Sequence, residues 1–195
     1  METASKSRTN PTHETAGTSI DRLKMGIYAA LFAALTAAGA YLAIPIGPVP
    51  IILQNMFVLL AGLMLGSKWG SISIGLYLFA GAIGFPVFSG GTGGIARLIG
   101  PTGGYLIGFL AAAYITGKAV EGFGDRWISR VAGMLIATLV VYGLGVSVLK
   151  WVTAMSWQKA FAVGVLPFLI GDGLKIAAAE AVYRMVSRQF PVPRP

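Results

Sequence analysis

Six apolar runs fill most of this 195-residue chain and limit its possible folds more than any other feature. They cover residues 25–44, 51–66, 69–84, 103–117, 131–149 and 162–186. A helix needs about 20 apolar residues to cross the hydrocarbon core of a bilayer, and it pairs its own backbone polar groups there. Only 11% of the residues are charged, against roughly 25% in soluble domains. We therefore predict an all-α membrane protein with six transmembrane helices.

The polar N-terminal segment differs from the rest of the chain. Residues 1–20 are rich in Ser and Thr and have no apolar period, which predicts a disordered cytoplasmic tail. Residues 21–190 are predicted to form a single six-helix membrane domain. The sequence Ala-Gly-Ala at 38–40 resembles a signal-peptidase site, but the apolar run around it is longer than the usual signal-peptide core of about 7–15 residues. We expect this run to stay in the chain as the first span.

Lysine and arginine residues predict how the chain is oriented in the membrane. There are 15 of them against 7 Asp and Glu, a net charge of +8 that would suggest a nucleic-acid partner in a soluble protein. Eleven of the 15 lie on one side of the predicted spans and three, Arg97, Lys150 and Lys159, on the other, while Lys175 lies within the last run. Because cytoplasmic loops are enriched in Lys and Arg, we predict cytoplasmic termini and no nucleic-acid partner.

Several classes of chemistry are disfavoured by what the sequence lacks. There is no Cys, and the only His, His13, lies in the polar tail, which argues against a metal site, a thiol nucleophile or a Ser–His pair. Gly117-Lys118 lacks the upstream glycine of a P-loop. An intramembrane enzyme would need paired carboxylates or histidines, whereas the acidic residues in the runs, Asp172 and Glu180, are eight residues apart. We predict a protein that is not an enzyme and holds no cofactor or metal.

The segment between the third and fourth runs is long, partly apolar and rich in glycine. Residues 85–105 contain seven glycines, at positions 90, 91, 93, 94, 100, 103 and 104. Glycine permits positive φ angles and close approach of the backbone to a ligand. A long loop of this kind in a compact domain is often a lid or a binding loop. The alternative is a connector at the membrane surface, and the predicted orientation places the loop at the outer face in either case.

Two opposite charges within the last run are the main candidates for a ligand site. Asp172 and Lys175 are three residues apart and share a helix face, roughly 15 Å from the outer start of the run. Charged groups at that depth usually face a cavity or the protein interior. The pair is either a ligand site or a structural ion pair. With Arg97 from the outer loop the site would carry a net charge of +1, which suits a monoanion such as a carboxylate.

An amide and several aromatic rings are further candidates for this site. Gln54 lies at the outer end of the second run, and its amide together with the carboxylate suits a ligand that has both N–H donors and carbonyl acceptors. Four rings are candidates for packing against an apolar ligand body, with ordinary core packing as the alternative. They are Tyr77, Phe85, Phe88 and Tyr105.

The first run carries two ladders of alanine at four-residue spacing. They are Ala29, Ala33 and Ala37 in one ladder and Ala30, Ala34 and Ala38 in the other. Small residues at this spacing let two helices approach closely. The ladders therefore predict either a contact within the bundle or a docking face for another membrane protein.

Four motifs resemble a known family. They are Gly-Pro-Val-Pro-Ile-Ile-Leu-Gln at 47–54, Gly-Phe-Pro-Val-Phe at 84–88, Gly-Pro-Thr-Gly-Gly-Tyr at 100–105 and Pro-Phe-Leu-Ile-Gly-Asp-Gly-Leu-Lys at 167–175. In this order and spacing they are similar to the BioY family, the biotin-specific substrate-binding (S) components of energy-coupling factor (ECF) transporters. Ile170 stands where that pattern more usually has proline, which we expect to affect entry into the helix more than ligand chemistry.

The resemblance implies a fold, a ligand and partners. It implies a six-helix S-component bundle in the inner membrane of a prokaryote, with an outer biotin pocket covered by the first and third loops. It implies that Asp172 and Lys175 contact biotin, together with Arg97, Gln54 and the backbone from Gly100 through Gly103 to Tyr105. It also implies that the alanine ladders dock onto a transmembrane coupling (T) component, which carries two cytoplasmic ATPases. Which charge meets the ureido ring and which the carboxylate stays open at this point. The alternatives are an S component for another vitamin and a membrane scaffold without a ligand.

Overall fold

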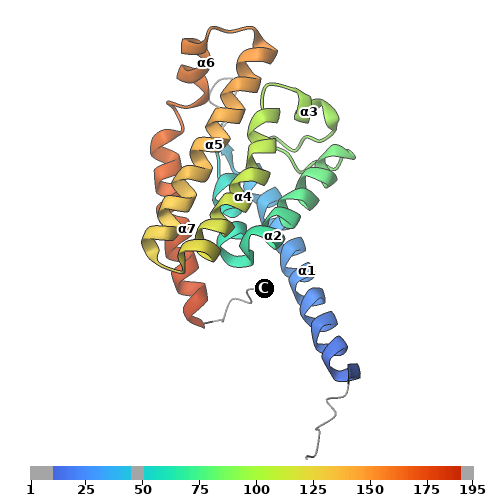
Figure 1. The fold of residues 1–195 in the computed structure, drawn as a ribbon. Helices are drawn as coiled ribbons and strands as arrows, with labels where there is room; N and C mark the ends of the chain where they lie inside the picture. Colours follow the sequence, from blue (N-terminus) through green and yellow to red (C-terminus); the bar gives the residue numbers. More distant parts are fainter. Residues whose placement is uncertain (1–10, 45–50, 190–195) are drawn as a thin grey trace, which may run out of the picture.

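A computed structural model describes the backbone of residues 11–44 and 51–189 and the side chains of residues 20–42 and 52–189. The predicted all-α architecture is confirmed in these ranges, where a short antiparallel pair of strands accompanies the helices (Figure 1). The elements are α1 (Pro11–Tyr41), β1 (Ala43–Ile44), β2 (Ile51–Ile52), α2 (Gln54–Ala82), α3 (Ile95–Ile99), α4 (Gly103–Phe123), α5 (Trp127–Thr153), α6 (Trp157–Gly164) and α7 (Leu169–Gln189).

The structure differs from the predicted N-terminal tail in residues 11–20. Residues 1–10 lie outside the described residues, but α1 begins at Pro11, so residues 11–20 are helical where we expected a disordered tail. Proline suits the first position of a helix because its fixed φ is helical and the N–H it lacks would have no partner there. Nothing after Pro11 in this segment interrupts the helix. The helix that contains the first apolar run therefore begins before that run, at Pro11.

Four described helices are each long and apolar enough to cross a membrane, namely α1 from Ile20, α2, α4 and α5. The helices α6 and α7 meet the same criterion as a pair, bent by 44°, which brings the count to five. The six predicted runs include two, 51–66 and 69–84, that are counted here as the single helix α2. The difference therefore lies in how α2 is counted.

The helix α2 consists of two arms that turn back on each other at Gly66. This glycine has φ 76° and ψ −178°, which is not helical, and a residue with a Cβ would be strained at that φ. Gly62 and Gly70 lie on opposite sides of the turn, and a Cβ built on Gly70 would be 3.0 Å from the Gly62 Cα. Eight residues of straight helix would separate them by about 12 Å. The two arms are therefore packed against each other, and they match the two predicted runs.

The helices form one bundle with distinct ends (Figure 1). The helix α2 packs against α1, α4 and α7, and α4 packs against α5. The start of α1, the end of α7 and the α4–α5 turn lie at one end, which we call the terminal end. The helix α3 and the α5–α6 turn lie at the opposite end, which we call the loop end. The two strands join the end of α1 to the start of α2, and residues 45–50 between them lie outside the described residues.

Candidate ligand-binding site

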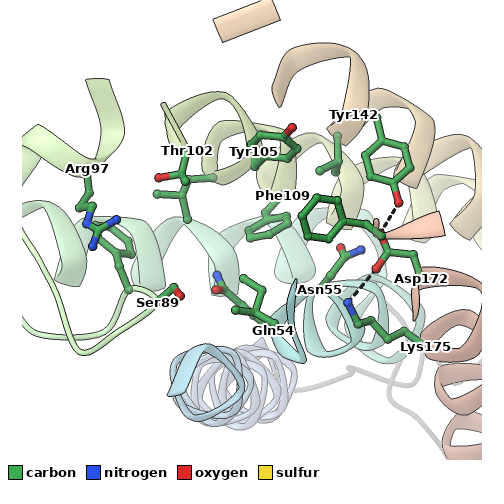
Figure 2. Close-up of a pocket in the computed structure, with 15 residues that line it drawn as sticks. Gln54, Asn55, Ser89, Arg97, Thr102, Tyr105, Phe109, Tyr142, Asp172 and Lys175 are labelled. Carbon is green, nitrogen blue, oxygen red and sulfur yellow. Dashed lines mark hydrogen bonds and ion pairs between the residues drawn. The ribbon is translucent and has the colours of Figure 1, made fainter. Parts of the chain in front are cut away.

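A pocket opens inside the bundle among the first turns of several helices (Figure 2). Its empty space is about 690 Å³, part of it open to solvent. Fifteen residues line it: Ile52, Gln54, Asn55, Phe88, Ser89, Arg97, Thr102, Tyr105, Leu106, Phe109, Val141, Tyr142, Phe168, Asp172 and Lys175.

A helix break places Asp172 in this pocket. Residues 165–168 separate α6 from α7, and Pro167 within them has no N–H to donate to the preceding turn. Asp172 consequently lies in the first turn of α7, where the helix dipole favours a negative charge. This position corrects our expectation that Asp172 and Lys175 lie deep inside one continuous helix. They lie instead where the span bends and a new helix begins.

The Asp172 carboxylate is held by two neighbours. Lys175 Nζ donates to Asp172 Oδ1 at 2.8 Å, and the Tyr142 hydroxyl donates to Oδ2 at 2.5 Å (Figure 2). All three residues are at least nine-tenths buried. The structural ion pair is therefore present and it lines the pocket, and its role in ligand binding stays a prediction. An ammonium has three donors, and in the described part of the chain Lys175 uses one of them.

Two amides at the start of α2 have polar atoms that are not hydrogen-bonded. The Nε2 and Oε1 atoms of Gln54 and the Oδ1 atom of Asn55 are buried without a hydrogen-bond partner among the described residues. The Tyr77 hydroxyl lies beside Gln54 but outside hydrogen-bond geometry. Leaving such a group unpaired costs about 1–3 kcal/mol. A ligand with its own donors and acceptors would pair these atoms.

Arg97 lies at the other end of the pocket. Gly94, with φ 97°, turns the glycine-rich loop into the five-residue helix α3, which carries Arg97. Among the described residues no carboxylate is within ion-pairing distance of this half-buried guanidinium. In Figure 2 Arg97 and Ser89 lie at one end, Asp172 and Lys175 at the other, and the rings of Tyr105 and Phe109 between them. The pocket thus has charged groups at both ends and a mostly apolar middle, in which the Gln54 amide also lies.

Two of the predicted aromatic residues form fixed walls of the pocket. The Tyr105 hydroxyl donates to the Gly164 carbonyl at 2.8 Å, which ties the first turn of α4 to the end of α6. Phe88 is held by backbone hydrogen bonds with Thr92 inside the glycine-rich loop. That loop supplies several lining residues, so in the structure it forms a wall of the pocket and is more than a connector.

Three other predicted residues do not line the pocket. Tyr77 stands behind Phe88, with ring centroids 5.5 Å apart at an interplanar angle of 76°. Phe85 is exposed. Gly103 lies at the junction of α3 and α4, where a Cβ would come within 1.8 Å of the Leu98 carbonyl oxygen, so only glycine fits there. Tyr77 and Gly103 therefore have packing roles next to the pocket, and a role for Phe85 in ligand binding stays a prediction.

Sequence reasoning missed more than half of the lining residues. They are Ile52, Asn55, Ser89, Leu106, Phe109, Val141, Tyr142 and Phe168, whereas Thr102 belongs to the predicted backbone segment 100–105. Two of them are polar residues within apolar runs, a sequence feature that could have marked them as candidates for the site. Asn55 follows Gln54 directly as a second amide at the start of an apolar run, and Tyr142 places a hydroxyl in the middle of another run. The apolar members carry no signal that separates them from ordinary core residues.

The alanine ladders of α1 have different surroundings. Ala29 is fully buried, and Ala33 and Ala37 pack against the core, so this ladder makes the contact within the bundle. Ala29 is therefore no longer a candidate for docking, while a docking role for the partly exposed Ala33 and Ala37 stays a prediction. Ala30 and Ala34 of the second ladder are exposed, and a docking role for them stays a prediction.

Comparison with known proteins identifies the family. The sequence pattern of the BioY family matches residues 9–192. The chain belongs to the BioY family. This membership confirms the resemblance seen in the four motifs, although residues 47–50 of the first motif lie outside the described residues.

Relatives within the BioY family are similar over most of their length. The chain is 45% identical over 155 residues to a probable biotin transporter BioY of Pyrococcus horikoshii, covering 78% of this chain and 90% of that protein. It is 41% identical over 159 residues to the biotin transporter BioY of Thermotoga maritima, covering 80% and 91%. A crystal structure of the S-component for biotin from an ECF-type ABC transporter superposes with a TM-score of 0.82 at 32% identity, covering 87% of this chain and 94% of that one.

Proposed function

We propose that this chain captures biotin at the outer face of the membrane as the substrate-binding subunit of an ECF-type importer. One observation carries the proposal: a chain of the BioY family has a pocket with an ion pair at one end, an arginine at the other, and buried amides of α2, and in the described residues this arginine has no carboxylate partner and three of the amide atoms have no hydrogen-bond partner. The relatives that match it are named as biotin transporters. A binding subunit also accords with the prediction that the chain is not an enzyme.

The chemistry of biotin matches the two ends of the pocket. Its ureido ring offers two N–H donors and one carbonyl acceptor, which suit the Asp172 carboxylate, the Lys175 ammonium and the amides of α2. Its valerate ends in a monoanionic carboxylate, which suits Arg97. The reverse orientation would bring the ligand carboxylate toward Asp172, where like charges repel. We therefore assign the ureido ring to Asp172 and the carboxylate to Arg97.

The pocket also suits a monoanion overall. The charges of Asp172 and Lys175 cancel, so Arg97 leaves a net charge of +1 among the lining residues. The first turns of α2, α4 and α7 contribute Gln54, Tyr105 and Asp172, and helix N-termini carry partial positive charge. The bicyclic ring system and methylene chain of biotin are apolar, like the middle of the pocket.

A membrane topology of six spans with cytoplasmic termini is part of the proposal. Counting the two arms of α2 separately, and α6 with α7 as one bent span, gives six crossings. The start of α1 and the end of α7 share the terminal end, as an even number of crossings requires. The eleven cations that flank the spans on this side favour its cytoplasmic location. The pocket, which is nearer the loop end, would then open outward from the inner membrane of a prokaryote.

Energy for uptake would come from partners. We propose that a T component and two cytoplasmic ATPases couple ATP hydrolysis to transport, because the sequence has no P-loop and the similar crystal structure is the S-component of an ECF-type transporter. The exposed residues Ala30 and Ala34 on α1 offer a surface for close helix packing with the T component.

A ligand screen tests the proposed specificity. Purified chain in detergent should unfold at a higher temperature in the presence of biotin and not in the presence of thiamine, riboflavin or other vitamins, because a ligand that binds only the folded state stabilises it. Saturation at 100 times Kd should stabilise the fold by about 2.7 kcal/mol. A larger shift with another vitamin would assign the chain a different substrate.

A further inference from the structure

A second hollow lies on the outside of the bundle, between α5 and α7. It has about 1600 Å³ of empty space and is open to its surroundings. Along α7 it is lined by Gly173, Ala177 and Ala181, small exposed residues four positions apart, and Leu135 of α5 contributes to the other wall. We call this feature the α5–α7 groove. It shares no lining residue with the ligand pocket.

The apolar part of the α5–α7 groove covers most of the depth of one leaflet. Gly173 and Ala181 mark its ends on α7, and eight residues of helix span about 12 Å. Half of a hydrocarbon core of about 30 Å is about 15 Å. Since the groove faces the bilayer and has only small exposed residues at positions 173, 177 and 181 of α7, part of an acyl chain can lie along this stretch.

The groove ends in a cluster of arginines at the terminal end. Glu180 at its floor accepts hydrogen bonds from Arg130 Nη2 at 2.5 Å and from Arg184 Nε at 2.7 Å. Arg130 also pairs with Asp125 at 2.6 Å. Arg188 lines the groove and makes no ion pair with the described residues. Three cations and two carboxylates leave this cluster with a net charge of +1.

We propose that the α5–α7 groove binds an anionic phospholipid, with an acyl chain along α7 and the headgroup phosphate at Arg184 and Arg188. A phosphodiester carries one negative charge, which balances the cluster. Basic pockets between helices on the cytoplasmic side are a recognised setting for anionic headgroups. A second copy of the chain fits less well, because a two-fold axis along the membrane normal would bring these arginines opposite the same arginines of the other copy. This inference does not rest on the proposed biotin function.

Native mass spectrometry of the full chain tests the proposal. The protein would be equilibrated in neutral detergent with equal amounts of phosphatidylglycerol and phosphatidylcholine. We expect preferential retention of phosphatidylglycerol, and about fivefold less preference for each arginine removed in Arg188→Gln and in the double variant Arg184→Gln with Arg188→Gln. The double variant Lys118→Gln with Arg126→Gln removes two cations at the same end outside the groove, and its preference should match that of the unmodified chain.

Two further experiments distinguish a bound lipid from other occupants of the groove. Ala177→Leu fills the groove without changing charge and should lower retention of both lipids, while biotin binding reports on folding independently. Soluble glycerol phosphate, which lacks acyl chains, should not displace phosphatidylglycerol. The proposal is overturned if the arginine variants keep the full preference, if glycerol phosphate competes equally, or if Ala177→Leu changes self-association instead of lipid retention.

Discussion

Replacing Asp172 by alanine will weaken biotin binding on the order of 100-fold, as measured by calorimetric titration of the purified chain. The carboxylate is the acceptor that we assign to the ureido N–H groups, and its loss also leaves the Lys175 ammonium buried without its partner 2.8 Å away. Truncating one member of a buried, hydrogen-bonded charge pair costs about 2–5 kcal/mol. Each 1.4 kcal/mol is about a factor of ten in affinity.

Two controls separate a loss of binding from a loss of folding. Asp21→Ala removes a carboxylate whose side chain is 77% exposed on α1, far from any ligand role, and this variant should keep the full affinity. Tyr142→Phe keeps the carboxylate but removes the hydroxyl that donates to it at 2.5 Å, so we expect a smaller loss, about tenfold. Full affinity in an Asp172→Ala protein that unfolds like the unmodified chain would show that this carboxylate does not bind the ligand.

Replacing Arg97 by glutamine will remove the preference for biotin over biotinamide, its neutral carboxamide. We assign the ligand carboxylate to this guanidinium, which among the described residues has no protein carboxylate in ion-pairing distance. Hydrogen bonds to charged groups contribute about 1.5–3 kcal/mol. The unmodified chain should therefore bind biotin roughly 10- to 100-fold more tightly than the amide, and Arg97→Gln should bind the two nearly equally.

The matched control for Arg97 is Lys159→Gln. Lys159 is an exposed cation on α6 near the loop end that does not line the pocket, and its variant should keep the full preference for biotin. If Arg97→Gln keeps the preference while Lys175→Gln loses it, the ligand lies in the opposite orientation to the one proposed. This pair of titrations thus resolves the question that the sequence left open.

The charged part of the site could be predicted because charge is rare in this chain. With so few ionisable groups inside the apolar runs, Asp172 and Lys175 stand out, and the structure places both at the pocket with Gln54 and Arg97. The apolar wall could not be predicted in the same way. Phe109 and Phe168 belong to apolar runs in which every residue is a suitable core residue, and only the three-dimensional packing selects them.

Backbone breaks explain most of the differences in the fold. Gly66 and Pro167 were visible in the sequence, but neither residue type alone says how far the chain turns. At Gly66 the helix breaks and its two arms fold back until Gly62 and Gly70 meet, while near Pro167 it bends by 44° and starts a new helix. The alanine ladders show a similar limit. Spacing predicts that a helix face approaches another helix closely, but it cannot tell a neighbour in the bundle, which Ala29 contacts, from a separate subunit.

The identity of the ligand that stays bound through purification tests the central proposal most directly. The chain would be purified from cells grown with biotin, denatured, and its small molecules identified and quantified by mass spectrometry. We predict biotin at about one molecule per chain, and much less in Asp172→Ala. Recovery of a different vitamin, or of no ligand from a folded protein that also fails to take up added biotin, would contradict the proposal.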